Sequence, residues 1–219
     1  MKKIDLETHE VKIDEIVSQE NIKKELNNSK EIIDWIGRQL DGQQDPKLSK
    51  EEKYKYAMSA YHFVIHCAQS ICILIDHEQY GAALALIRPL KDSFLRGNWL
   101  QNIATTDEFI CAKEKNQFPP ANKLIEDIPP ELNGPQMKDA LNILNDFVHI
   151  GFKQLEYRIL GNNSIGNSFP RLVIVGALGI ADTFGLAAIC DMTKDWERKS
   201  TYEEAFKRFR ELESQNKFL

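Results

Sequence analysis

The sequence predicts an all-α fold: a single-domain helical bundle with a buried apolar helix near the C-terminus. In every long segment the apolar residues recur at intervals of three and four, as in a helix, and no segment alternates as a strand does. With 42% hydrophobic residues among 219, the chain can bury a substantial core. We expect one domain, in which an N-terminal helical region at 1–48 packs on a bundle core at 49–219.

The first helical region is expected at residues 10–41, where apolar residues follow helical spacing until a run of turn-forming residues ends the pattern. The polar run Asn27–Ser29 marks a candidate break into two pieces. Ser49 and Glu52 have the spacing of a capping box, in which a hydroxyl and a carboxylate each satisfy a backbone N–H. A long helix is therefore predicted from Ser49 to about residue 77.

The next helix is predicted at residues 82–103, with Pro89 inside it. Proline removes one backbone hydrogen bond and clashes with the preceding turn, so we expect the helix to kink or to start there. Thr105 and Glu108 predict another cap, followed by a short helix to Asn116.

The C-terminal half contains three further predicted helices, after a proline-rich connector with a short helix around Leu124. The first occupies residues 135–159 and has a regular apolar stripe. The second, at 170–192, is apolar on nearly every face. A membrane span is the alternative there, but a buried helix is favoured because Asp182 would lie near the bilayer centre. Ser200 is expected to cap the last helix.

Charge and cysteine content limit the function and the compartment. A formal net charge of −5 argues against an extended basic surface that coats nucleic acid, while leaving room for a local basic pocket. The four cysteines share no C-x-x-C spacing, which favours a reducing compartment. The first residues show neither a signal peptide nor an anchor. We expect a cytoplasmic protein with no membrane partner, and no cofactor.

The first candidate for chemistry is the pair Asn145 and His149. Four residues apart, they share one face of the helix predicted at 135–159. A histidine can act as general acid or base near neutral pH, and an amide beside it can orient a substrate. The alternative is a half-buried histidine capped by its neighbour, because one histidine on a helix is not a catalytic motif.

The second candidate is a charged line of Arg88, Asp92 and Arg96, which repeats every four residues along one helix face. Asp92 can pair with either arginine. An arginine pair beside the apolar stripe is suited to bind phosphate or carboxylate. The alternative is a solvated ladder of ion pairs, each worth a few tenths of a kcal/mol.

The third candidate is His62 and His66, which could supply two imidazole ligands to a metal. No cysteine or carboxylate has a companion spacing, and the glutamate of a zincin motif is absent. A pair of interfacial histidines is therefore favoured, and no metal is predicted. The sequence contains no P-loop, dinucleotide fingerprint or nucleophile elbow.

The runs Ala83–Leu100 and Leu144–Gly151 resemble a group of uncharacterised bacterial helical proteins. The shared pattern is an Arg-Pro-Leu helix that ends in Trp-Leu and a later helix with Asn-x-x-x-His-x-Gly. The resemblance covers roughly residues 55–190. That group in turn looks like distant kin of HEPN domains, helical bundles that often act as metal-independent RNases in phage defence and in toxin–antitoxin systems.

This resemblance implies a HEPN-like homodimer that binds or cleaves RNA or a nucleotide in a defence or stress context. The HEPN motif is an arginine, usually a polar residue, three more residues and a histidine. Asn145 and His149 match it, but Leu144 stands where the arginine should be. Either Arg88 or Arg96 replaces the missing cation, or the domain binds without cutting. The competing interpretation is a non-catalytic interaction module or dimeric scaffold.

Overall fold

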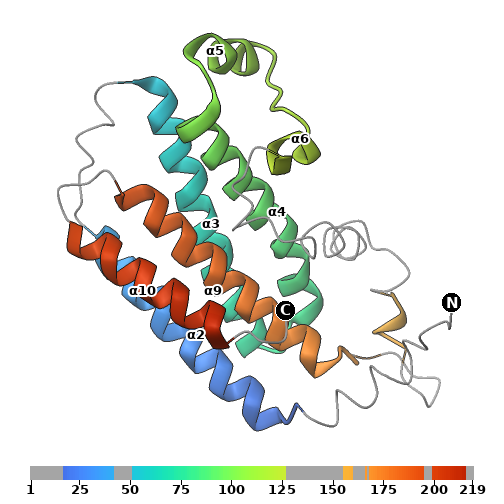
Figure 1. Ribbon diagram of the computed structural model, residues 1–219. Helices are drawn as coiled ribbons and strands as arrows, with labels where there is room; N and C mark the ends of the chain where they lie inside the picture. Colours follow the sequence, from blue (N-terminus) through green and yellow to red (C-terminus); the bar gives the residue numbers. More distant parts are fainter. Residues whose placement is uncertain are drawn as a thin grey trace, which may run out of the picture.

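The computed structural model describes residues 17–41, 51–126, 155–159, 166, 168–194 and 199–215. Within them the chain is mostly helical and forms no β-strand, which confirms the all-α prediction. Five long helices lie side by side, and two short ones sit together at one end of the bundle (Figure 1). The long helices are α2 (Gln19–Leu40), α3 (Glu52–Asp76), α4 (Tyr80–Asn98), α9 (Arg171–Thr193) and α10 (Lys199–Gln215), and the short ones are α5 (Thr106–Glu114) and α6 (Ala121–Glu126).

Helix α9 lies at the centre of the bundle and packs against α2, α3, α4 and α10 (Figure 1). Many of its buried residues are small, among them Ala177, Ala181 and Gly185, which lets the neighbouring helices approach closely. A helix that is apolar on most faces must bury most faces. The prediction of a buried helix near the C-terminus is therefore confirmed.

Helices α3 and α9 are each long and apolar enough to cross a membrane by length and composition. Core helices of bundles meet the same criterion. In this structure 56% of the apolar window of α9, and 50% of that of α3, is buried against other parts of the protein. Packing between helices thus accounts for much of their apolar character.

Helix α2 corrects the prediction of a break at Asn27–Ser29, because it runs through that segment without interruption. The hydroxyl of Ser29 is fully buried and donates a hydrogen bond of 2.7 Å to Oδ2 of Asp182 in α9. This contact with α9 thus keeps Ser29 in a helical conformation, although serine otherwise favours turns. The helix begins after Ser18, which forms a reciprocal cap with Asn21.

The start of α3 also differs from its prediction. The residue that precedes the helix is Glu51, and its side chain makes no capping hydrogen bond. Ser49 lies outside the described residues, two positions before this cap. The capping box of Ser49 therefore stays a prediction, and the long buried face of α3 stabilises the helix.

Helix α4 neither begins nor ends at Pro89, but continues to Asn98 and then into a π-helical turn, η2 (Trp99–Ile103). Its packing against α3 and α9 offsets the hydrogen bond that proline removes. The two helices come very close near the end of α4: a Cβ atom on Gly97 would lie 2.8 Å from the ring of Tyr61 in α3. This contact fixes the position of the charged side chains of α4.

The predicted cap of α5 is confirmed. Oγ1 of Thr105 accepts a hydrogen bond from the backbone N–H of Glu108 at 3.2 Å, and Oε2 of Glu108 accepts one from the N–H of Thr105 at 2.9 Å. Helix α6 is the short helix predicted around Leu124. Of the helix predicted at 135–159, only residues 155–159 are described, and a turn follows the helical residues there. Ser200 lies inside α10 rather than capping it.

Candidate functional site

The described part of the predicted site consists of Arg88, Asp92 and Arg96 of α4. Together with Lys91, a fourth charged residue of the same helix, they form what we call the α4 ridge. They carry three formal positive charges and one negative charge, hence +2, on a chain whose formal net charge is −5. A local excess of positive charge on an acidic protein is the signature of an anion site rather than of a nucleic-acid coat.

Arg88 and Asp92 form an ion pair along the helix. Nε of Arg88 lies 3.1 Å from Oδ1 and 3.0 Å from Oδ2 of Asp92, and the two side chains are 25% and 23% exposed. Both contacts use Nε alone. The terminal guanidinium nitrogens of Arg88 make no hydrogen bond to the residues that the structure describes. Asp92 therefore orients Arg88 through Nε, and the terminal nitrogens of Arg88 are not engaged by the described part of the chain.

Lys91 is a residue of the ridge that the sequence analysis did not single out. Its side chain is only 2% exposed. Burial lowers its pKa to about 8, Asp92 opposes this shift, and Arg88 adds to it. An amine with a pKa near neutrality is common at functional sites, because it can hold or release a proton there. The sequence could have revealed Lys91, because helical spacing places this lysine on the buried stripe between Ile87 and Phe94.

Arg96 does not extend the ion-pair ladder that its spacing suggested. Its guanidinium lies over the ring of Phe118, 5.0 Å from the ring centroid. Phe118 in turn meets Trp99 edge to face, with the ring centroids 5.9 Å apart. The ridge thus has one end where Arg88 is paired with a carboxylate and another where Arg96 is stacked on an aromatic ring.

Asn145, His149 and Leu144 lie outside the described residues. We expect Arg88 and His149 to meet on facing helices, and this stays a prediction. Within the described part of the chain, the structure brings Arg88 and Asp92 together and separates Arg96 toward Phe118.

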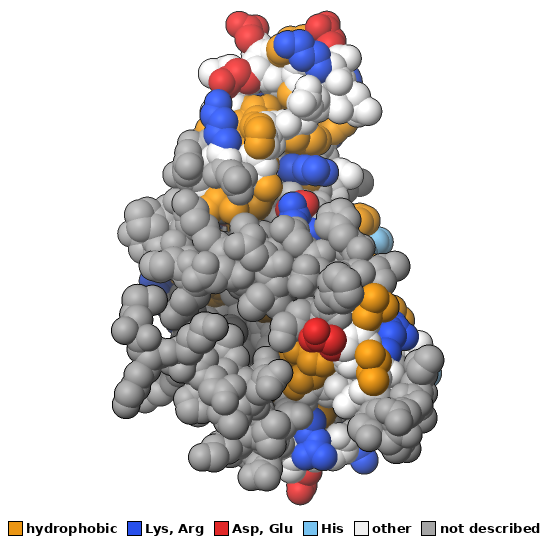
Figure 2. Space-filling view, turned by 90° about the vertical axis from the view of Figure 1, so that its right-hand side faces the viewer, with side chains coloured by type: hydrophobic (Ala, Val, Ile, Leu, Met, Phe, Trp, Pro, Cys, Tyr) orange, Lys and Arg blue, Asp and Glu red, His pale blue; other side chains and the backbone are white. Residues whose placement is uncertain are grey.

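Beside the Arg96 end of the ridge lies a cavity of about 320 Å³, which we call the aromatic cavity. Figure 2 shows hydrophobic side chains gathered below the charged tip of the molecule, with lysine and arginine side chains among them. The aromatic rings that line the cavity come from three different elements and from the segment after α5: Tyr56 of α3, Trp99 of η2, Phe109 of α5 and Phe118. The sequence analysis did not find this group, because its members lie far apart along the chain.

Lys113 of α5 lies at the same cavity. Its Nζ is 2.6 Å from Oε1 of Glu52 and stands over the rings of Tyr56 and Phe109, at 5.5 and 6.0 Å from their centroids. The hydrogen bond with Glu52 raises the pKa of Lys113. The cavity is therefore lined by aromatic rings, and at its edge stands a lysine that is paired with a carboxylate.

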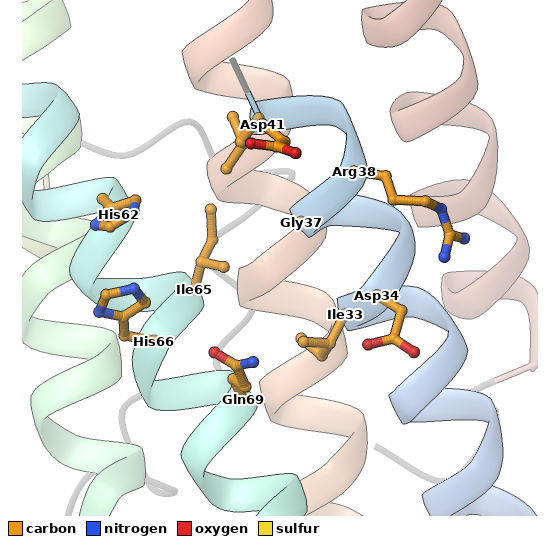
Figure 3. A pocket seen from close by; sticks show the side chains of 10 residues that line it. Ile33, Asp34, Gly37, Arg38, Asp41, His62, Ile65, His66 and Gln69 are labelled. Atoms are coloured by element: carbon orange, nitrogen blue, oxygen red, sulfur yellow. The ribbon is translucent and has the colours of Figure 1, made fainter. Parts of the chain in front are cut away.

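The two histidines of the third candidate line a different hollow, a groove of about 520 Å³ between α2 and α3 (Figure 3). The rings of His62 and His66 touch, with centroids 4.2 Å apart, and burial and the charge of His66 lower the pKa of His62. Asp34 and Arg38 of α2 point away from the histidines (Figure 3). Among the described residues no group of three histidines, cysteines or carboxylates could hold a metal.

A polar cluster that the sequence did not reveal joins α3, η2 and the end of α9. The hydroxyl of Tyr61 donates to Oδ2 of Asp191 at 3.0 Å, and Nε2 of Gln101 donates to the backbone carbonyl of Asp191 at 3.0 Å. Lys194 donates to Asn102 at 2.7 Å. These contacts satisfy polar groups at a helix junction, so the cluster positions η2 and with it Trp99.

Comparison of the chain with protein-family models, with curated proteins and with solved structures finds no match. Function is therefore inferred from the geometry of the α4 ridge and the aromatic cavity.

Proposed function

We propose that the chain is a single-domain, HEPN-like helical bundle that binds RNA or a nucleotide through the α4 ridge, as a cytoplasmic homodimer in a defence or stress context. The observation that carries the proposal is the positive ridge itself: Arg88 held by Asp92 through Nε, buried Lys91, and Arg96 stacked on an aromatic ring.

Phosphate is the ligand that this arrangement suits best. A guanidinium presents paired N–H donors that match phosphate oxygens, and it binds best when its orientation is fixed beforehand. Asp92 holds Arg88 by Nε, and Phe118 supports the flat face of Arg96. Both arginines are therefore pre-organised, which lowers the entropy lost when a ligand binds.

Cleavage would need a proton carrier as well as a cation. His149 is the residue proposed to move protons, with Asn145 to orient the substrate. Leu144 cannot stabilise the charge that develops on the phosphate, and such stabilisation supplies a large share of the rate. Arg88 or Arg96, on another helix, would have to stabilise this charge instead. We therefore expect weak or no metal-independent RNase activity.

The test measures binding and cleavage of a single-stranded RNA in EDTA, with every variant first shown to fold by circular dichroism. We expect Arg88→Ala and Arg96→Ala to weaken binding and to reduce any cleavage strongly, and His149→Ala to abolish cleavage. Arg210→Ala is the matched control, because Arg210 is also stacked on a phenylalanine, 5.1 Å from the ring of Phe206 in α10. Equal binding by Arg88→Ala, Arg96→Ala and the control would contradict the proposal.

The second candidate is a non-catalytic interaction module, and exposed apolar side chains of α3 favour it. Phe63 and Ile73 are 49% and 51% exposed. Large apolar groups at the surface often mark protein contacts. Sedimentation of the Phe63→Ser and Ile73→Ser variants distinguishes RNA binding from an interaction module. If these variants lose a dimer that the wild type forms, and the wild type binds no RNA, the interaction module is favoured.

A further inference from the structure

We propose that the aromatic cavity is a nucleobase site, in which a base of the bound RNA or nucleotide stacks between aromatic rings while its phosphate reaches the α4 ridge. This inference rests on the proposed function and adds the part of the ligand that the cavity recognises.

The lining of the cavity fits a flat aromatic ligand. Its rings form two edge-to-face pairs: Tyr56 with Phe109, with centroids 5.4 Å apart and planes at 60°, and Trp99 with Phe118, with planes at 77°. Trp99 and Phe109 are 5% exposed, so a base would stack on Tyr56, which is 42% exposed, and on the partly exposed Phe118. Bases that leave a helix are commonly bound by stacking on such side chains. A volume of about 320 Å³ lies at the lower end of the range for small-ligand pockets, which suits a single base.

The position of Arg96 connects the cavity to the ridge. Its guanidinium lies on the ring of Phe118, and Phe118 is part of the cavity wall. A base that enters the cavity therefore has a cation beside its sugar and phosphate. Lys113 adds a second cation at the edge, where it is held by Glu52. An aliphatic ligand without charge would gain little from either group.

The cavity also contains groups that can read the edge of a base. Asn116 and Gln117 line it, and each side-chain amide carries both donors and an acceptor, as the edges of bases do. Asn116 has a φ of 48°, in the left-handed region, which directs the chain sharply after α5. Trp99 begins the π-helical turn η2, and such turns are frequent at functional sites.

The experiment compares two ligands with the same phosphates: a hexaribonucleotide of adenosine and an abasic hexamer of the same length, each titrated into the full chain by calorimetry. We expect the ligand with bases to bind at least about tenfold more tightly, because base stacking on an aromatic side chain contributes about that much per base. Phe118→Leu should remove most of this difference, whereas Phe118→Trp, which keeps a ring, should retain it.

Phe206→Leu is the matched control, because Phe206 also carries an arginine on its ring, on the surface of α10. If Phe118→Leu fails to fold, Tyr56→Leu replaces it, since Tyr56 is 42% exposed and tolerates the change more easily. Equal binding of the two hexamers overturns the nucleobase site and leaves the proposed function intact. Binding of neither hexamer overturns both, and a difference that survives Phe118→Leu and Tyr56→Leu places the base elsewhere.

Discussion

Among the described residues two charged side chains are buried, and they differ in almost every other respect. Asp182, 4% exposed, lies in the middle of α9 and faces α2, where it meets Ser29. Lys91, 2% exposed, lies in α4 beside the ion pair of the ridge. Burial raises the pKa of Asp182 to about 7 and lowers that of Lys91 to about 8, so each is driven toward its neutral form.

The surroundings of the two residues indicate a structural role for Asp182 and a functional role for Lys91. Oδ2 of Asp182 accepts a bond from Ser29, whereas Oδ1 has no partner among the described residues. Both side chains of this contact are buried, so Asp182 serves to align α2 with α9. Lys91 lies in the same helix as Arg88 and Arg96, and Arg96 lies over Phe118 in the wall of the aromatic cavity. Burying a charged group costs stability at both positions. We expect RNA binding to be independent of the charge of Asp182 and to require that of Lys91.

The largest expected effect is a gain of stability on Asp182→Asn. Since the pKa of Asp182 is raised by burial, the stability present at acid pH is lost as the pH rises from about 4 to 7. The variant should exceed the wild type by about 4 kcal/mol at pH 8, and by less than about 2 kcal/mol at pH 5. Urea unfolding at both pH values measures this. A gain that does not change with pH would mean that the pKa of Asp182 is not raised in the folded protein. Unchanged RNA binding is expected at both pH values.

Lys91→Met should give the opposite dependence on pH. Because the pKa of Lys91 is lowered by burial, the cost of its charge is complete below about pH 8 and disappears as the pH approaches 10.5. We expect the variant to be more stable by about 3 kcal/mol at pH 7 and by about 1 kcal/mol at pH 10. Unlike Asp182→Asn, it should also weaken RNA binding. Retained binding with raised stability would remove Lys91 from the site.

These two residues also show how far the sequence predicts the molecule. Helical spacing predicted α4 and α9, because burial of a helix face requires apolar residues at intervals of three and four along the sequence. It could not show that Asp182 meets Ser29 or that Arg96 meets Phe118, since both contacts join segments that the fold alone brings together. The break expected at Asn27–Ser29 was wrong for the same reason: a partner in α9 overrides the local preference of Ser29.

A smaller effect is expected where α4 rests on α3. In Gly97→Ala the new Cβ would lie 2.8 Å from the ring of Tyr61, which is fully buried and bonded to Asp191. Overpacking of this kind costs about 1–3 kcal/mol, and the shift of α4 should also weaken RNA binding. Gly37→Ala is the control, because nothing lies within 4 Å of its Cβ. That control should gain up to about 1 kcal/mol in thermal unfolding. Equal stability of the two variants would contradict the tight contact.

The smallest change in stability is expected for Asp92→Asn, which breaks the ion pair of the ridge. A pair four residues apart on a partly exposed helix face contributes about 0.5 kcal/mol, and salt screens it. Glu204→Gln is the control, because Glu204 forms the corresponding pair with Arg208 at 2.9 Å in α10.

Both of these variants should unfold at nearly the wild-type urea concentration, but they should differ in binding. Asp92→Asn removes the negative charge of the ridge, so its affinity for RNA should rise and its dependence on salt should steepen. Glu204→Gln changes the net charge of the chain equally at a distance from the ridge and should leave both unchanged. If Asp92→Asn instead weakens binding, then Asp92 is needed to hold Arg88 in place. That result would make orientation of the guanidinium, rather than the charge of the ridge, the factor that limits affinity.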